Sequence, residues 1–212
     1  MARIKLLVAY YNNKSFLEVI EMFENIDITI YNKSDEEFDI SECTNKNQVK
    51  TLPLENIGRE GETYLRHIIE NYDNLDDYTI FIQDDADNHI MDYSGFVEKT
   101  YQLVNANVPF YQYPCQWRNS GIYTPTVYNG IVEVCGFFPT PYAIRDLCDE
   151  LEINLPERYV TETCAFFMVD KNTIRKRPVE FYVKLKEWLL QGQAYGFVLE
   201  HTWKIIFDNT HY

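Results

Sequence analysis

Short apolar runs alternate along the chain with segments in which apolar residues recur every three or four positions. Residues 4–10 and 78–82 are continuous apolar runs, and residues 27–31 alternate and are rich in β-branched side chains, so these segments predict strands. Residues 16–24 and 58–72 carry apolar side chains at helical spacing and predict helices. Alternation of strand and helix predicts an α/β fold with a mostly parallel central sheet and helices on both faces.

The rest of the chain is less regular. Residues 32–50 are polar and predict a surface excursion, and residues 108–129 are rich in Pro, Tyr and Gly and predict a long ordered loop or short strands. Asp170 is placed to cap a helix, which we expect to break at Pro178 and then continue. The other predicted elements are strands at residues 131–138 and 164–169 and helices at residues 96–104, 142–151 and 197–207. With 212 residues, no repeat and no low-complexity linker, we expect a single domain.

The charge balance restricts the partners. The chain has 33 acidic and 19 basic residues, a formal net charge of -14. Such a surface repels nucleic acid and anionic lipid, so we expect no nucleic-acid partner and no membrane insertion. A phosphate-bearing ligand has to be held by local features, namely a metal ion, one or two arginines, or backbone amides. The 17 tyrosines suit either an aromatic core or a site for bases and sugars.

The cysteines indicate a reducing compartment. There are five of them, an odd number, and no CxxC pair occurs, which argues against a zinc site and against a disulfide framework. The first apolar run is too short for a signal peptide, and no run is long enough to cross a bilayer. We therefore expect a cytoplasmic protein.

The most distinctive chemical feature is the acidic sequence Asp84-Asp85-Ala86-Asp87, directly after the apolar strand at residues 78–82. Carboxylates two positions apart at a strand end can reach the same hard cation, and Mg²⁺ and Mn²⁺ prefer oxygen ligands. Such a cation can bridge the two phosphates of a donor and neutralise the leaving group. The alternative is an exposed acidic turn.

A second feature opens the helix that precedes this strand. In Asn56-Ile57-Gly58-Arg59-Glu60, a glycine and exposed amides at a helix start suit a phosphate or ribose, and Arg59 supplies positive charge. Ordinary capping, with Glu60 favourable at a helix start, explains the same residues equally well.

The order of these motifs resembles the nucleotide-binding half of GT-A glycosyltransferases. A strand ends in ValAlaTyrTyrAsn, AsnIleGlyArgGlu opens a helix, and TyrThrIlePheIleGlnAspAspAlaAsp carries the D-x-D after a strand. The longer segment around AsnIleGlyArgGlu and the terminal GluHisThrTrpLysIleIlePhe also resemble a family of largely uncharacterised proteins, and chlorovirus glycosyltransferase domains that decorate the major capsid protein. The resemblance covers nearly the whole chain, and its D-x-D is the generic part.

The resemblance implies a GT-A-like, Rossmann-like fold, with a nucleotide-binding half at about residues 1–90 and an acceptor-side half at about residues 91–212. The implied activity is transfer of a hexose or deoxyhexose from a UDP-sugar to a glycan or glycoprotein acceptor, dependent on Mn²⁺ or Mg²⁺. For a viral protein the compartment would be the host-cell cytoplasm. Because nothing after the terminal helix could bind an acceptor, we also expect further domains of a longer polypeptide.

The resemblance also implies site residues. Metal ligands would be Asp85, Asp87 and His201; relatives often carry a single Asp followed by a His, which makes His89 an alternative ligand to Asp87. His201 could instead be a core histidine. The nucleotide would be held by Ala9, Tyr10, Tyr11, Asn12, Arg59, Asp84 and Asp85.

Catalysis is assigned to Asp85, through the metal, and to Glu162. An inverting enzyme needs a carboxylate to deprotonate the acceptor hydroxyl, and Glu162 precedes the predicted strand at residues 164–169. A surface Glu in a loop is the alternative, and a retaining enzyme needs no such base, so stereochemistry stays open.

Two other classes of function compete with this interpretation. A metal-dependent phosphatase would use an aspartate nucleophile, although such enzymes place the D-x-D after their first strand. A non-catalytic carbohydrate-binding module would use the Tyr-rich stretch at residues 111–128 and would need neither metal nor nucleotide. Release of phosphate from simple monoesters would favour the phosphatase, and metal-dependent nucleotide binding would exclude the carbohydrate-binding module.

Overall fold

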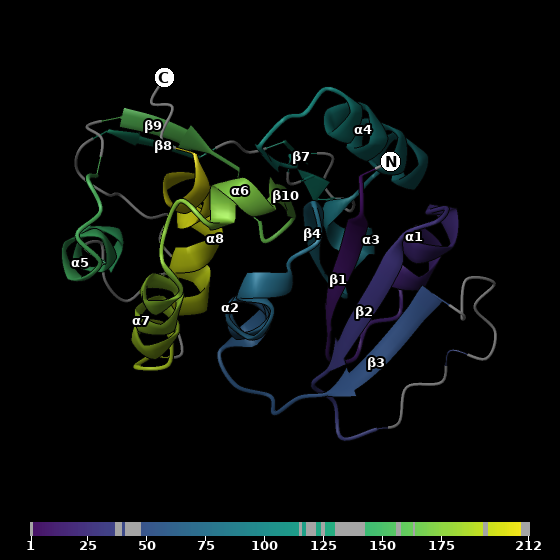
Figure 1. Ribbon diagram of the computed structural model, residues 1–212, viewed down its shortest axis with the longest axis horizontal. Coiled ribbons are helices and arrows are strands. Elements are labelled where there is room, and N and C mark those ends of the chain that lie inside the picture. The colour runs from purple at the N-terminus through teal and green to yellow at the C-terminus, as the bar shows by residue number, and fades with distance from the viewer. Residues whose placement is uncertain are drawn as a thin grey trace.

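A computed structural model describes residues 2–36, 40, 48–114, 116–117, 122–123, 126–129, 143–155, 158–162, 164–192 and 195–208. In these residues a six-stranded sheet forms the centre of the molecule, in the order β3-β2-β1-β4-β10-β5 (Figure 1). Its strands are β1 (Ile4–Tyr10), β2 (Asp27–Asn32), β3 (Val49–Pro53), β4 (Tyr78–Gln83), β5 (Phe110–Gln112) and β10 (Phe167–Asp170). The first four are parallel, whereas β10 runs antiparallel to both β4 and β5.

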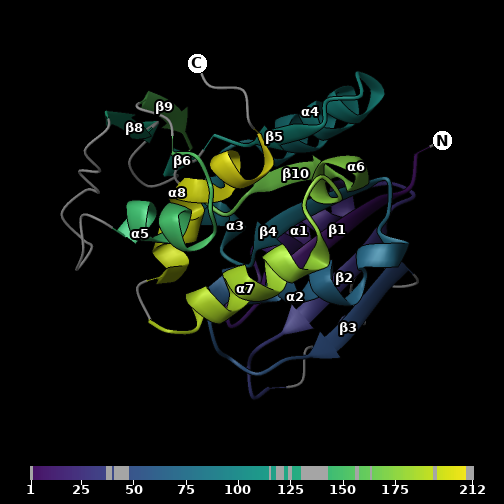
Figure 2. The same cartoon turned by 60° about the vertical axis from the view of Figure 1, so that its left-hand side comes forward.

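Helices cover both faces of the sheet. On one face lie α1 (Phe16–Met22) and α4 (Tyr93–Asn105), and on the other α2 (Arg59–Glu70), α7 (Val179–Leu189) and α8 (Tyr195–Phe207). Figure 2 shows α7 lying across α2 in front of the sheet. Successive residues of β1 serve the two faces in turn, since Leu6 and Val8 join the α1 side and Leu7 and Ala9 the α2 side.

Smaller elements complete the described parts of the chain. Short helices occur at α3 (Ala86–His89), α6 (Lys171–Ile174) and η2 (Tyr72–Asn74), and α5 (Ala143–Glu150) lies beside α8. Two small antiparallel pairs join β6 (Gln116–Trp117) to β7 (Ile122–Tyr123) and β8 (Thr126–Asn129) to β9 (Arg158–Thr161). Within the described residues, no helix is both long and apolar enough to span a bilayer.

Aromatic side chains hold α2 and α8 onto the sheet. The ring centroids of Phe81 and Phe167, on β4 and β10, are 4.8 Å apart and the rings are stacked. Tyr64 of α2 lies 4.9 Å from Phe81, and Trp203 of α8 lies 5.0 Å from Phe167. Aromatic pairs at such separations stabilise a core beyond the area they bury. Part of the high aromatic content is therefore structural.

The predicted α/β class, with a mostly parallel sheet and helices on both faces, is confirmed. The helix break at Pro178 is also confirmed, because α6 ends at Ile174 and α7 begins at Val179. The strand expected at residues 164–169 starts only at Phe167. The prediction of an irregular segment up to residue 50 is wrong at its end, because β3 begins at Val49. The strand expected at residues 131–138 lies outside the described residues.

Candidate active site

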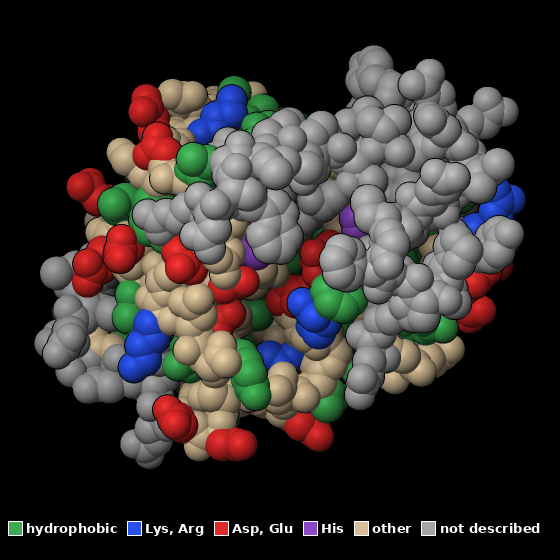
Figure 3. All heavy atoms as spheres, turned by 180° about the vertical axis from the view of Figure 1, so that it is seen from behind, with side chains coloured by type: hydrophobic (Ala, Val, Ile, Leu, Met, Phe, Trp, Pro, Cys, Tyr) green, Lys and Arg blue, Asp and Glu red, His purple; other side chains and the backbone are tan. Residues whose placement is uncertain are grey.

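A cavity of about 500 Å³ opens at the carboxyl ends of β1 and β4, beside the start of α2. Acidic, basic and histidine side chains meet near the middle of the face seen in Figure 3. The cavity is lined by Ala9, Tyr10, Tyr11, Asn12, Asn13, Lys33, Asn56, Arg59, Glu60, Gln83, Asp84, Asp85 and Asn88. Every residue predicted to hold the nucleotide is therefore in this lining. The carboxyl edge of a parallel sheet is where ligands bind in open α/β folds.

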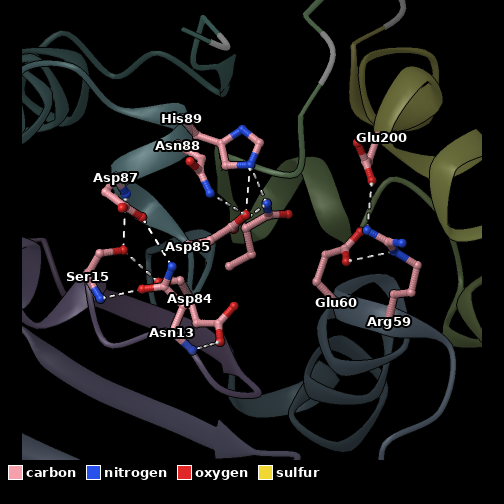
Figure 4. Close-up of polar contacts among 11 residues, drawn as sticks. Asn13, Ser15, Arg59, Glu60, Asp84, Asp85, Asp87, Asn88, His89 and Glu200 are labelled. Carbon is pink, nitrogen blue, oxygen red and sulfur yellow. Dashed lines mark hydrogen bonds and ion pairs between the residues drawn. The ribbon is translucent and has the colours of Figure 1, made fainter. Parts of the chain in front are cut away.

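Asp85 lies between two groups of polar residues, as Figure 4 shows. Asp84 and Asp87 turn toward the β1–α1 loop on one side, and Arg59 and Glu60 of α2 lie on the other. The three aspartates of the acidic motif therefore have different surroundings.

Asp84 holds the β1–α1 loop. Its Oδ2 accepts hydrogen bonds from the backbone N–H groups of Tyr11, Asn12 and Asn13, at 2.8, 2.8 and 2.9 Å. The hydroxyl of Ser15 donates to the Asp84 carbonyl at 3.1 Å. An ionised carboxylate with three amide donors is a strong local anchor. Asp84 thus shapes the cavity wall, with its Oδ2 used by three backbone amides of the loop.

Asp87, like Asp84, contacts Asn13 and Ser15 of the β1–α1 loop. Its Oδ1 accepts from the side-chain amide of Asn13 at 3.2 Å, and its backbone N–H donates to the Ser15 hydroxyl at 3.1 Å. Asp87 is not among the residues that line the cavity. Asp87 is therefore engaged with the β1–α1 loop, and its pairing with Asp85 around a cation stays a prediction. Strand alternation does not extend this far, because the chain turns into α3 after Asp85.

Asp85 is the aspartate that faces the cavity with an organised carboxylate. Gln83 Nε2 donates to its Oδ1 at 2.6 Å, Asn88 Nδ2 donates to its Oδ2 at 3.5 Å, and His89 Nε2 lies 3.4 Å from Oδ2. Burial raises the pKa of Asp85, but the contacts from His89, Gln83 and Asn88 outweigh it, and the net pKa is lowered. Asp85 is accordingly held as an anion.

The start of α2 brings a cation and a second carboxylate to the cavity. Gly58 and Arg59 have φ values of 60° and 55°, so two successive residues take the left-handed conformation that glycine accepts and arginine rarely does. The Arg59 guanidinium lies over the Phe197 ring and approaches Glu60 Oε2 at 3.5 Å and Glu200 Oε1 at 3.9 Å. Glu60 is buried, and burial raises its pKa against the opposing charge of Arg59. From sequence, Glu60 was only a favourable charge at a helix start.

Lys33 is a further cavity residue that sequence reasoning missed. It is 5% exposed, and its Nζ donates to the carbonyl of Ile57 at 2.6 Å and to the carbonyl of Arg59. Burial lowers its pKa to about 8. Lys33 therefore fixes the backbone that presents Arg59. Its position just after β2, at the carboxyl edge of the sheet, was the available signal.

Of the predicted metal ligands, Asp87 and His201 do not line the cavity with Asp85, whereas the alternative ligand His89 lies 3.4 Å from the Asp85 carboxylate. His201 is a buried residue of α8, and burial lowers its pKa to about 4. The described residues contain no group of three or more His, Cys, Asp or Glu side chains arranged to hold a metal ion. The carboxylates that line the cavity are Asp84, Asp85 and Glu60. Because Mg²⁺ is commonly bound by one or two carboxylates plus substrate phosphates, Asp85 with Glu60 still fits such an ion.

Glu162, the predicted base, lies near the terminal helix. Gln112 Nε2 donates to the backbone carbonyls of Glu162, Cys164 and Glu200, at 3.0, 3.2 and 3.2 Å. This amide ties the segment before β10 to α8, whose Glu200 approaches Arg59. Glu162 is not among the cavity-lining residues, so its catalytic role stays a prediction.

The Tyr-rich stretch is described only in part. Tyr113 is buried, and its hydroxyl shares a hydrogen bond with Thr100. Tyr111 is partly buried beside it, with ring centroids 5.2 Å apart. The side chains of residues 115–130 lie outside the described residues, so the predicted carbohydrate surface is not tested there.

The fold and this cavity define an α/β protein with a polar site at the carboxyl edge of its sheet. Residues 6–212 match the family model described as "Protein of unknown function (DUF3431)", and the chain belongs to that family. No curated protein matches the sequence.

Solved structures of S. aureus TarS resemble the chain weakly. TarS 1–349 has a TM-score of 0.47 and 7% identity, over 89% of this chain and 56% of that one. TarS has a TM-score of 0.44 and 9% identity, over 87% of this chain and 34% of that one. TarS 1–349 in complex with UDP has a TM-score of 0.44 and 9% identity, over 87% of this chain and 53% of that one. This chain thus spans about half of the TarS 1–349 structures and a third of the longer one. At these TM-scores the likeness carries no conclusion about activity.

Proposed function

We propose that this protein is a glycosyltransferase that moves a hexose or deoxyhexose from a UDP-sugar to a glycan acceptor, dependent on Mn²⁺ or Mg²⁺. The observation that carries the proposal is the cavity at the carboxyl ends of β1 and β4, where Arg59, Asp85 and Glu60 meet. The sequence resemblance to GT-A enzymes supplies the reaction class and the uridine nucleotide.

The cavity suits a nucleoside diphosphate. Its volume of about 500 Å³ lies within the range of small-molecule sites. Lys33 is used by backbone carbonyls, so Arg59 is the cation presented to a phosphate. Arg59 can donate to phosphate oxygens in a fork, and its side chain is 44% exposed.

The carboxylates explain why a cation would be needed. Asp85 and Glu60 face the same space, and the Asp85 anion would repel a diphosphate in a chain of net charge -14. A divalent cation held by Asp85 and Glu60 would remove that repulsion and neutralise the charge that develops on the departing diphosphate. Asp87 and His201 are left out of this set because the structure brings neither to the cavity lining.

The other residues have supporting parts. The loop at Tyr11 and Asn12, held by Asp84, would contact the base and ribose. In an inverting reaction the acceptor oxygen bonds to the anomeric carbon, the bond from that carbon to the diphosphate oxygen breaks, and the electron pair leaves with the diphosphate. Glu162 would accept the hydroxyl proton. A glycan of a viral capsid protein as acceptor, and the host-cell cytoplasm as compartment, are proposed on the sequence resemblance alone.

Calorimetry tests the proposal directly. We expect UDP to bind in the presence of Mn²⁺ and binding to weaken strongly when EDTA replaces the metal, with ADP and CDP as the matched diphosphates. Equal UDP affinity in both conditions would remove the metal from the proposal. Turnover of p-nitrophenyl phosphate with no hydrolysis of any UDP-sugar would favour the phosphatase instead, and glycan binding without nucleotide binding would favour the carbohydrate-binding module.

A further inference from the structure

A second cavity, of about 250 Å³, lies on the other side of α3. We refer to it as the α3–α4 cavity, since those helices provide much of its wall. It is lined chiefly by aromatic and charged side chains, namely His89, Asp92, Phe96, Lys99, Tyr111 and Phe166. No part of the nucleotide proposal uses it.

The short helix α3 separates the two cavities. Asn88 lines the larger cavity, and the next residue, His89, lines the α3–α4 cavity. His89 Nε2 lies 3.4 Å from Asp85 Oδ2, and the His89 ring packs on Phe166 with centroids 5.3 Å apart. A ligand in the α3–α4 cavity is therefore one imidazole ring away from the carboxylate that faces the proposed diphosphate. Figure 4 shows this His89–Asp85 contact.

The far wall carries aromatic faces with charges at the rim. Phe96 and Tyr113 lie 4.4 Å apart between ring centroids, and Tyr111 adjoins Tyr113. Lys99 Nζ lies 5.5 Å from the centre of the Tyr111 ring, and both Lys99 and Asp92 are exposed. Flat apolar faces beside exposed charged groups match a pyranose, which has an apolar C–H face and a ring of hydroxyls at its edge.

The predicted base lies on this side. The pKa of Tyr111 is raised first by burial and then by the negative charge of Glu162, so that carboxylate lies within electrostatic reach of the cavity wall. The α3–α4 cavity thus has the Asp85 carboxylate behind His89, and the Glu162 backbone is bonded by Gln112, the neighbour of Tyr111 in β5. An acceptor hydroxyl has to lie between the donor and its base.

We infer that the α3–α4 cavity binds one pyranose ring of the acceptor glycan. The inference rests on the proposed glycosyl transfer, since only that reaction requires a sugar beside the diphosphate. With half the volume of the nucleotide cavity, it accommodates a single ring, and the remaining acceptor extends into solvent past Met91, which is 49% exposed.

The test uses saturation-transfer NMR with a panel of methyl pyranosides, and cyclohexanol as an apolar ring that carries a single hydroxyl. We expect at least one pyranoside to bind, and Tyr111→Leu and Met91→Ala each to weaken it about tenfold. Tyr111→Leu keeps an apolar side chain in β5, and Met91→Ala alters an exposed side chain, so at least one variant folds. Met22→Ala, at a 44% exposed methionine of α1 away from both cavities, is the matched control.

Calorimetry of UDP with Mn²⁺ on the same samples separates this inference from the proposed function. UDP binding together with no pyranoside binding, or with pyranoside binding insensitive to both cavity variants, overturns the inference and leaves the proposed function standing. Cyclohexanol binding as strongly as every pyranoside also overturns it, because the cavity would then recognise only an apolar ring. Failure of UDP binding overturns the proposed function, whatever the pyranosides do.

Discussion

The guanidinium carbon of Arg59 lies 3.9 Å from the centre of the Phe197 ring, so α8 supports the side chain that α2 presents to the cavity. One face of the guanidinium is covered by the ring, and its N–H groups are left at the edge. Cation–π contact and carboxylate neighbours hold Arg59 in place without using all of its donors. This arrangement makes Arg59 the first residue to test.

Arg59→Ala should weaken UDP binding by about 1.5–3 kcal/mol, the usual contribution of a hydrogen bond to a charged group. Arg59→Lys should lose part of that, because an ammonium lacks the planar fork. Calorimetry gives the affinities and urea unfolding the stability. Arg175→Ala, at an exposed arginine that contacts the Tyr72 and Asp73 carbonyls, is the control and should leave UDP affinity unchanged. Unchanged affinity in Arg59→Ala, together with lost stability, would make Arg59 purely structural.

Asp85→Asn should abolish sugar transfer and donor hydrolysis while the fold is kept. Asparagine has the same size, but it presents an amide where a cation needs an anionic oxygen. The measurement is an activity series across Mn²⁺ concentrations, with circular dichroism to verify folding. Asp87→Asn is the matched variant, and because Asp87 contacts Asn13 and Ser15, we expect much milder loss. An inactive Asp87→Asn together with an active Asp85→Asn would show that Asp87, and not Asp85, binds the metal.

Asp84→Ala should lower both stability and nucleotide affinity. Three backbone N–H groups of the β1–α1 loop would lose their acceptor, which we expect to cost about 2–4 kcal/mol of unfolding free energy. Asp84→Asn keeps a neutral acceptor and should cost roughly half as much. Urea unfolding measures the effect, and hydrogen exchange at Tyr11, Asn12 and Asn13 localises it. Undiminished exchange protection of these amides in Asp84→Ala would contradict the anchoring role.

Stability should fall with acid because of buried His67. Its ring is 4% exposed, its Nδ1 lies 3.2 Å from the Tyr31 hydroxyl, and burial, with a smaller effect of the Lys5 charge, lowers its pKa to about 4. Between pH 6.5 and pH 4 the unfolded chain binds a proton at His67 and the folded chain does not. The free energy of unfolding is therefore highest above pH 6.5 and falls as the pH approaches 4. The loss from His67 is about 3 kcal/mol.

His201 has the same lowered pKa of about 4, so both histidines contribute to this slope. His67→Gln keeps an acceptor for Tyr31 and should remove about half of the histidine contribution to the pH dependence in urea unfolding measured from pH 7 to pH 4. A variant with the full wild-type slope would show that His67 is already accessible to protons in the folded protein.

The sequence predicted the inner strands because burial on both sides leaves a continuous apolar run, as in β1 and β4. It missed β3, an edge strand whose residues are at most partly buried and therefore mostly polar or exposed. Lys33 and Glu60 were missed for a different reason. A charged residue gives no sequence signal of burial, and both are buried only because the start of α2 approaches the end of β2.

The acidic motif does follow β4 directly, as the sequence predicted, but the side toward which Asp87 points was predicted wrongly. Strand alternation predicted that Asp84 faces away from Asp85 and Asp87. Asp84 does separate from Asp85, yet Asp87 lies on the Asp84 side, because Asp85 begins a turn of helix and alternation ends there. Which carboxylate the backbone amides would use depends on the neighbouring β1–α1 loop, and no local pattern encodes that.

The antiparallel strand β10 has a consequence for how the chain assembles during synthesis. β5 (Phe110–Gln112) joins the sheet through β10, which also pairs with β4 and begins only at Phe167. Until the ribosome has released that segment, the β4 edge is exposed and β5 has no place in the sheet. Unpaired strand edges are prone to associate with other chains. A domain whose strands pair across distant segments of the chain can finish folding only after the last of these segments has been synthesised. A nascent chain arrested before Phe167 should therefore depend on chaperones in a way that the finished protein does not.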